Sequence, residues 1–563
     1  MMKEVEQKEK KDIEEKNEKE KIEIKPNHPL TFIELLENQI KSNLISFTLL
    51  LDAFIILIKI LVGFFGYSGE NDPPKYGDFE AQRHWMELTI YLSPDEWYTN
   101  SEHNEEKYWP LDYPPLSGYH SYILGKILNV FIPASVEFEY SHGYESINFK
   151  NVMRFFSLFS DLVVFHIGLH FFCYKIFIKD KINKNKKPLY LNYFIIQILI
   201  LLNPLMIIID HGHFQFNNVM HGFFVFAVYF LFSEKYVLAI IFLSLCVNFK
   251  QMGLYFALVF PFYVVRKLFF SEKKKNYFVS LLFIIIYGII TVLINGIIYY
   301  PWIKSHKLKD VFNRIFPVKR GIFEDKVATF WCVLNVFIKL NKKFENNFLV
   351  KLSLLFTILN CILPIYAIFK ANKVTKKICM QCFFIISLAF YLFSFHVHEK
   401  TIIVPFLAFL LNLPYMKKIL PSFTLIGMFS LFPLLQRENQ IVPYYLINLI
   451  FYLFAKFGNK LLAKKKEKNE KKYIYFIIEI AIFIIMILYH AIEYMIPPPE
   501  KYPWFYPMIN AMFCFSFFFG IFIYSNYSLF KNIYLIRKIY RKLQNKYPLS
   551  NREEKNDYLF ILV

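Results

Sequence analysis

Glycine, cysteine and tryptophan are scarce in this chain of 563 residues, which contains 17, 7 and 6 of them. The low glycine content excludes a collagen-like chain, and the low cysteine content excludes a small disulfide scaffold. The chain has instead 66 phenylalanines, 56% hydrophobic residues and a mean hydropathy of +0.33. This composition excludes a disordered protein and favours lipid as the solvent, in which apolar runs of roughly 20 residues span the hydrocarbon.

The net charge of +20 at pH 7 is concentrated in short basic blocks between the apolar runs. Such blocks occupy residues 179–187, 266–275, 370–377, 456–472 and 531–557. Residues 67–117, by contrast, are rich in Asp and Glu. The positive-inside rule produces this asymmetry, because basic connections stay in the cytosol. It predicts cytosolic N- and C-termini, basic blocks in contact with membrane lipids, and no nucleic-acid partner.

The apolar runs predict an all-α polytopic membrane protein with about 14 transmembrane helices. The runs begin near residues 43, 152, 190, 219, 236, 253, 277, 348, 376, 401, 419, 442, 473 and 504. A further helix, near residues 117–131, has the amphipathic character of an interfacial helix. The predicted parts are a disordered cytosolic tail (1–41), a catalytic membrane module (42–400) with lumenal loops (67–151 and 299–347), C-terminal transmembrane helices (401–530) and a basic cytosolic tail (531–563).

Polar side chains on the predicted lumenal side are candidates for chemistry. Asp78 follows Gly77, where the chain can turn, and in a helix Glu80, His84 and Glu87 would share a face. A carboxylate at this position can take the proton of an incoming sugar hydroxyl, as glycosyl transfer requires. The alternative interpretation is a solvated acidic loop.

Two further polar elements join apolar runs with hardly any spacer. Residues 210–218 include His211 and His213, which indicate a substrate-binding pocket, helix capping or, less well supported, a zinc site. Lys250 lies at another such junction and either extends toward the membrane surface or holds a phosphate. The segment 396–400 (HVHEK) places four ionisable side chains between apolar runs, which is costly unless they are used or paired.

The chain resembles the endoplasmic-reticulum glucosyltransferases that use dolichyl-phosphate-glucose to extend the lipid-linked N-glycan precursor. The resemblance rests on five strings in order: GDFEAQRHWME at 77–87, LDYPPL at 111–116, GHFQ at 212–215, the segment 316–331, and VHEK at 397–400. Two sister enzymes add the first and the second glucose. Residues 250–252 (KQM) and 323–328 (FEDKVA) resemble the first-glucose enzyme, whereas residues 210–211 (DH) are closer to its sister.

The resemblance implies a GT-C glycosyltransferase of the endoplasmic-reticulum membrane, with its active site facing the lumen. Glucose would pass in α-1,3 linkage, with inversion, from dolichyl-phosphate-glucose to the terminal mannose of a dolichyl-diphosphate-linked oligosaccharide. Asp78 would be the general base. The implied phosphate-binding residues are His398, Lys400 and Arg320, and the implied substrate-binding residues are Glu80, Asp112, His213, Gln215 and Lys250. No metal or other cofactor is expected.

A transporter or lipid scramblase is the alternative from another class. Such a protein would place polar residues at the membrane midplane, between inverted repeats. A non-catalytic oligosaccharide-binding relative is a third possibility. The polar clusters of this chain lie at one predicted face and retain Asp78 and the VHEK segment, which favours an enzyme.

Overall fold

The computed structural model describes residues 31–270, 276–318, 321–322, 326–371, 374–462 and 472–546. These residues form helices and connections, and their only β-type pairing is an isolated bridge between Ser101 and Asn104. The predicted all-α class is therefore confirmed. The chain divides into two compact units at Phe47, and the functional side chains lie in the second unit.

The first unit contains α2 (Phe32–Ser42), which corrects the predicted boundary of the disordered tail at residue 41. Thr31 and Glu34 form a capping box, in which each side chain bonds the backbone N–H of the other. This box satisfies two donors at the start of α2 and so favours a helix. The rest of the predicted tail, residues 1–30, lies outside the described residues.

Nine helical segments among the described residues are long and apolar enough to cross a membrane. They are α3 (Leu44–Gly63), the run from α6 to α8 (Ile147–Ile182), the run from η6 to α14 (Gln251–Phe269), α15 (Tyr277–Ile298), α20 (Asn346–Lys370), α21 (Lys376–Phe393), α26 (Ile441–Leu461), α27 (Lys472–Met495) and α28 (Phe505–Lys546). A polytopic membrane protein is thereby confirmed. The helix α28 also continues into the predicted basic tail, of which residues 547–563 lie outside the described part.

The predicted count of about 14 spans is not confirmed, although every predicted apolar run is helical. The remaining runs are α9 with α10 and η5 (Tyr190–Leu201 and Pro204–Phe214), α11 (Asn217–Phe232), α12 (Tyr236–Phe249), α22 (Ile403–Leu411) and α24 (Leu420–Ser430). A helix of 14 residues is about 21 Å long, whereas the hydrocarbon core is about 30 Å thick. The first of these runs bends by 56° where Pro204 interrupts the helix. If this bent pair of helices is counted as one span, the described residues contain ten spans.

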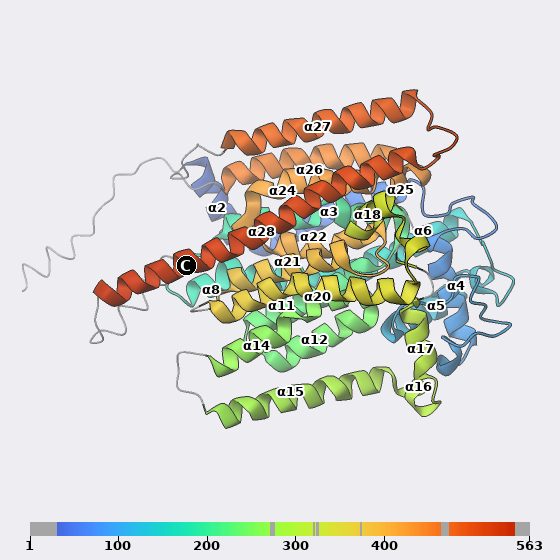
Figure 1. The fold of residues 1–563 in the computed structure, drawn as a ribbon, viewed down its shortest axis with the longest axis horizontal. Helices are drawn as coiled ribbons and strands as arrows, with labels where there is room; N and C mark the ends of the chain where they lie inside the picture. The colour runs from blue at the N-terminus through green and yellow to red at the C-terminus, as the bar shows by residue number, and fades with distance from the viewer. Residues whose placement is uncertain are drawn as a thin grey trace, which may run out of the picture. The chain divides into compact units, whose positions relative to one another are not determined.

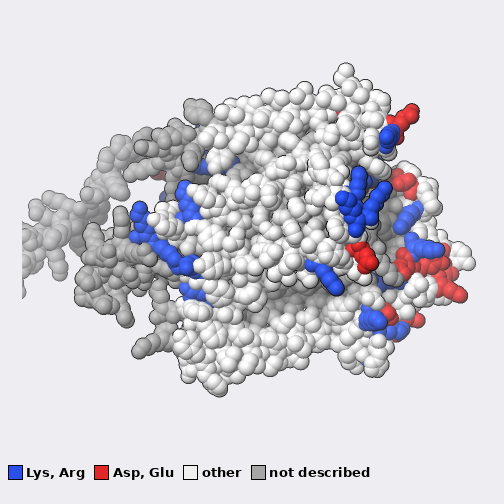
Figure 2. All heavy atoms as spheres, viewed as in Figure 1, with Lys and Arg blue, Asp and Glu red and all other residues white. Residues whose placement is uncertain are grey.

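The surface of the helices agrees with a lipid environment. None of the residues in the most apolar 18-residue stretch of α15 is buried. The helix exposes large side chains such as Leu282, Ile289 and Val292. On the face drawn in Figure 2, an uncharged band separates Lys and Arg side chains at one end from a mixed acidic and basic group at the other. An exposed apolar band between charged ends is typical of a membrane protein.

The charged connections at one end of the long helices fold into short helices. Figure 1 shows α4 (Asp78–Tyr91), α5 (Pro115–Phe131), α16 (Tyr300–Lys304) and α17 (Leu308–Ile315) gathered there. The helix α4 begins directly after Gly77, whose extended backbone ends the preceding turn. The helix near residues 117–131 is confirmed, and of the two interpretations of the segment after Gly77, a helix or a solvated acidic loop, the structure shows the helix.

Arg83 forms ion pairs with two acidic side chains of α4, Glu80 and Glu87. Its guanidinium makes a two-point contact with the Glu80 carboxylate, with both N–O distances 2.7 Å, and a third at 2.7 Å to Glu87. It also donates to the backbone carbonyl of Ser135 (3.1 Å) and the hydroxyl of Ser141 (2.5 Å). The cluster therefore ties α4 to the loop that follows α5.

Replacing Arg83 with Met is expected to lower the melting temperature of the purified protein strongly. Two carboxylates would remain buried without their cation, which costs about 3–5 kcal/mol of folding free energy for a broken buried pair. Thermal unfolding in detergent measures the effect. The matched control is Lys126→Met on α5, where the cation is exposed and little change is expected. Equal melting temperatures for the two variants would contradict this role of Arg83.

Candidate active site

Asp78, the first residue of α4, lies where three distant parts of the chain meet. One carboxylate oxygen, Oδ2, accepts hydrogen bonds from His213 Nε2 (2.8 Å), from the Gln215 amide and from the Lys400 ammonium. The Asp78 backbone N–H donates to the Ser68 hydroxyl (3.0 Å), which holds the start of α4 in place. The structure thus brings together four of the predicted site residues.

The other carboxylate oxygen of Asp78, Oδ1, accepts no hydrogen bond from any residue in the described ranges. The side chain keeps 21% of its exposure, so this oxygen can be reached from outside the protein. Burial alone would raise the pKa of Asp78, but Lys400 and His213 outweigh it and hold the pKa well below its usual range. The carboxylate is therefore ionised at neutral pH, with a free lone pair available to accept a proton.

His213 lies between two carboxylates. Its Nε2 contacts Asp78, and its Nδ1 is 2.6 Å from Oε1 of Glu438, which follows α25 (Phe432–Arg437). Both ring nitrogens can donate at once only in the imidazolium form, which the two carboxylates favour and the Lys400 ammonium, 3.2 Å from Nε2, opposes. Glu438 was not among the predicted site residues. Its signal in the sequence is the polar segment 436–440 between two apolar runs.

Lys250, at the end of α12, reaches the same cluster indirectly. Its ammonium donates to the side-chain oxygens of Gln215 (3.0 Å) and Asn217 (2.7 Å), and it lies 4.4 Å from the centre of the Tyr113 ring. The Gln215 amide donates in turn to Asp78. Lys250 therefore orients the Gln215 side chain, and its predicted contact with substrate stays a prediction.

A second ionic network lies among the long helices. Lys59 of α3 donates to Asp161 of α6 and to Nε2 of His166 (2.9 Å). The Nε2 of His211 is 2.9 Å from the same Asp161 carboxylate, and Nδ1 of His166 is 2.7 Å from Asp52. His211 and His213 both belong to η5 (Ile208–Phe214), so this network anchors the turn that places His213 against Asp78.

Asp52, His166 and His170 are close enough together to ligate a metal ion. Hydrogen bonds within the protein already account for this group. Lys59 donates to His166 Nε2, so neutral His166 carries its proton on Nδ1 and donates it to Asp52. The Gln197 amide donates to Nδ1 of His170, whose Nε2 then donates to Asp52.

His84, Glu87 and His142 form the other group of this kind among the described residues. Glu87 already accepts hydrogen bonds from Arg83 (2.7 Å) and from the Ser141 hydroxyl (3.0 Å). A guanidinium this close would repel a metal cation. Neither group therefore fits a metal better than it fits its present hydrogen bonds.

The other predicted site residues lie outside the contacts of Asp78. His398 is half-buried two residues before Lys400, with its ring against His396 at 5.1 Å. Glu80 belongs to the Arg83 cluster, and the Asp112 backbone carbonyl accepts a bond from Gln251 at 3.4 Å. Arg320 lies outside the described residues, as do residues 323–325 of the predicted first-glucose motif. Their predicted roles stay predictions.

Lys400→Met is expected to move the acid limb of the pH profile of kcat/KM to higher pH. The predicted general-base role of Asp78 requires the carboxylate form, and Lys400 lowers the pKa of Asp78. Activity that depends on this group should therefore survive below the usual pKa of an aspartate, about 3.9, in the unaltered protein, whereas without the ammonium the pKa rises and activity is lost at a higher pH. The pH profiles of the unaltered protein, of Lys400→Met and of the control Lys418→Met, which replaces an exposed lysine, are measured side by side. Coincident acid limbs would contradict the account.

Comparison with known proteins identifies the family. A model of the ALG6, ALG8 glycosyltransferase family matches residues 55–524. A protein of Arabidopsis thaliana, "Probable dolichyl pyrophosphate Man9GlcNAc2 alpha-1,3-glucosyltransferase", is 36% identical over 490 residues, which cover 85% of this chain and 89% of that protein. A Saccharomyces cerevisiae protein named "Dolichyl pyrophosphate Man9GlcNAc2 alpha-1,3-glucosyltransferase" is 32% identical over 510 residues, covering 84% of this chain and 90% of its own. This chain belongs to the ALG6, ALG8 glycosyltransferase family.

Proposed function

We propose that this chain transfers glucose from dolichyl-phosphate-glucose, in α-1,3 linkage, to the terminal mannose of the dolichyl-diphosphate-linked Man9GlcNAc2 oligosaccharide. The observation that carries the proposal is the Asp78 carboxylate, with one oxygen held by three donors and the other free. The names of the relatives support the acceptor and the linkage. Attack from the face opposite the leaving group converts a β-linked donor into an α-linked product.

Asp78 is the general base in the proposed reaction. The free Oδ1 accepts the proton of the acceptor hydroxyl as its oxygen forms a bond to the anomeric carbon of glucose. His213, Gln215 and Lys400 fix the other oxygen, so the free one is aimed before substrate binds. Such a prepositioned base contributes typically 10²–10⁴-fold to a rate.

The leaving group is dolichyl phosphate, which departs as the bond between the anomeric carbon and the phosphate oxygen breaks. A phosphate needs cations or hydrogen-bond donors rather than a general acid. Lys400 is the proposed principal cation, because its ammonium lies beside Asp78 and its side chain keeps 16% exposure. His398, two residues earlier, and Arg320 are the further proposed phosphate ligands.

The proposed location is the endoplasmic-reticulum membrane, with the Asp78 end of the helices in the lumen and both termini in the cytosol. The charged end that carries α4 and α5 in Figure 1 contains the acidic segment 67–117, whereas the five basic blocks are expected on the other side. The positive-inside rule supports this orientation.

Purified protein tests the proposal with dolichyl-phosphate-glucose and two lipid-linked acceptors, one without glucose and one that already carries a single glucose. Product is expected on the glucose-free acceptor alone, with and without EDTA. Product only on the monoglucosylated acceptor would assign the chain to the second step. No transfer to either acceptor by folded protein would contradict the proposed function and favour transport.

A further inference from the structure

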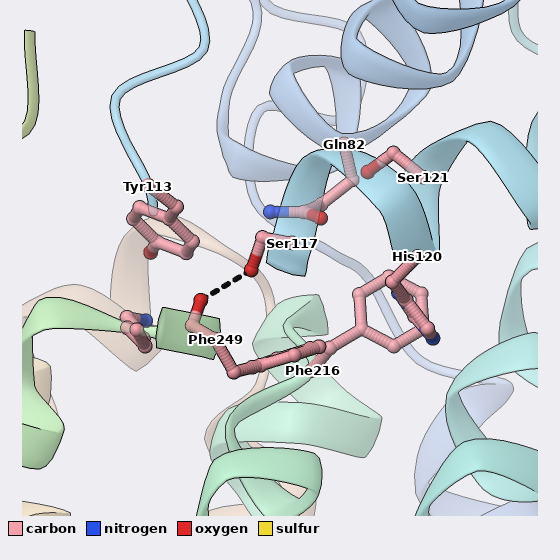
Figure 3. A pocket seen from close by; sticks show the side chains of 8 residues that line it. Gln82, Tyr113, Ser117, His120, Ser121, Phe216 and Phe249 are labelled. Carbon is pink, nitrogen blue, oxygen red and sulfur yellow. Dashed lines mark hydrogen bonds between the residues drawn. The ribbon is translucent and has the colours of Figure 1, made fainter. Parts of the chain in front are cut away.

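A small cavity lies between α4, α5 and the junction of α12 with η6. Two phenylalanines and six polar or aromatic residues line it, namely Gln82, Tyr113, Ser117, His120, Ser121 and Lys250. Figure 3 shows these side chains, apart from Lys250, converging from separate elements, with the Gln82 amide projecting from α4 into the space above Ser117. The free volume is about 10 Å³, enough for a single water-sized group such as a hydroxyl.

The cavity adjoins the proposed base through two connections. Gln82 lies four residues after Asp78 in α4, so both side chains project from the same face of that helix. Lys250, on the opposite wall, donates to Gln215, whose amide donates to Asp78. The cavity therefore lies next to the Asp78 site, separated from its carboxylate by Lys250 and Gln215 on one wall and sharing helix α4 with it on the other.

Two polar side chains in the wall have no hydrogen-bond partner among the described residues. Gln82 is 5% exposed and Ser121 2% exposed, so both residues are buried, and both line the cavity. Their neighbours are paired: Ser117 donates to the Phe249 carbonyl, and His120 Nε2 lies 3.1 Å from the Ser160 hydroxyl. A buried polar group without a partner is costly, so these two point to a ligand that completes them.

We propose that this cavity binds one hydroxyl group of a hexose held at Asp78, with Gln82 as the recognising side chain and Ser121 as its neighbour. This inference rests on the proposed glucosyl transfer. A hydroxyl both donates and accepts, and so matches an amide, which has both functions. The cavity admits one hydroxyl group and no sugar ring, so it would recognise the hydroxyl at a single position of the sugar. The sugar is the donor glucose or the acceptor mannose.

The test combines Gln82→Met with substrates that lack one hydroxyl at a time. Donors carry single-deoxy glucoses, and acceptors carry single-deoxy terminal mannoses. For one analogue, the unaltered protein is expected to lose about tenfold in kcat/KM, the value of one good hydrogen bond. Gln82→Met should show about the same loss on the natural substrate and no further loss on that analogue. If that analogue is a deoxy-glucose donor, the recognised sugar is glucose; if it is a deoxy-mannose acceptor, the recognised sugar is mannose.

Equal losses by Gln82→Met on every natural and deoxy substrate would overturn the inference, because the cavity would then hold water only. If Gln82→Met does not fold, as judged by its melting temperature, Ser121→Ala undergoes the same series with the same criterion. Gln39→Met on α2 is the matched control and should behave like the unaltered protein. Failure of the unaltered protein to transfer any glucose would refute the proposed function itself, which is a distinct outcome.

Discussion

Asp78→Asn is expected to lower kcat for glucose transfer by about 10²–10⁴-fold, the range by which a general base accelerates a reaction. The substitution keeps the size of the side chain but removes its capacity to take a proton. The KM values should change far less than kcat, because the substitution leaves the proposed substrate-binding side chains Lys400, His213 and Gln215 in place. Single-turnover assays with radiolabelled donor measure the chemical step directly.

The matched control is Asp72→Asn, which removes an exposed carboxylate six residues earlier in the same connection. Its activity should equal that of the unaltered protein. Transfer at near-normal rates by folded Asp78→Asn would mean that another group takes the proton. Glu438 would then be the next acid to examine, because it shares His213 with Asp78.

Lys59→Met is expected to destabilise the protein by about 3–5 kcal/mol, the cost of breaking a buried ion pair. Lys59 is buried in the apolar helix α3 and donates to Asp161, whose carboxylate would lose this cation and keep only the contact with His211 among the long helices. Because His211 contacts the same carboxylate, the turn that carries His213 should also lose its anchor and activity should fall. Chemical unfolding in detergent gives the stability.

The double variant Lys59→Met/Asp161→Asn separates charge imbalance from loss of packing. Removing both charges together eliminates the unpaired ion, so most of the lost stability should return. A double variant whose destabilisation is the sum of the two single effects would show that the pair is not coupled, and would contradict the network described above.

The fold was largely predictable because apolar runs are long and their boundaries are polar. All fourteen runs are helices, whereas the helix that follows Gly77 was only one of two interpretations of the acidic segment. The number of spans was not predictable, because α11, α12 and α24 are apolar but too short to cross alone. Hydropathy reports whether a helix avoids water, and it does not distinguish lipid from protein as the surrounding medium.

The sequence predicted which residues form the site better than it predicted which of them contact one another. The motifs at 77–87, 212–215 and 397–400 supplied Asp78, His213, Gln215 and Lys400, which the structure brings together. Glu438 and the Lys59–Asp161 pair depend on contacts between segments more than 100 residues apart, which no local pattern reports. The two histidines of 210–218 illustrate this limit: His213 contacts Asp78, whereas His211 faces Asp161.

The anomeric configuration of the first product tests the central claim, a single displacement at the anomeric carbon, most directly. The donor is β-linked dolichyl-phosphate-glucose, and proton NMR of the glucosylated oligosaccharide reports the new linkage. The account predicts an α-linked glucose on the terminal mannose, because one attack opposite the leaving group inverts the anomeric carbon. A β-linked product would contradict it, because retention requires a second displacement and a nucleophile that Asp78 as a base does not provide.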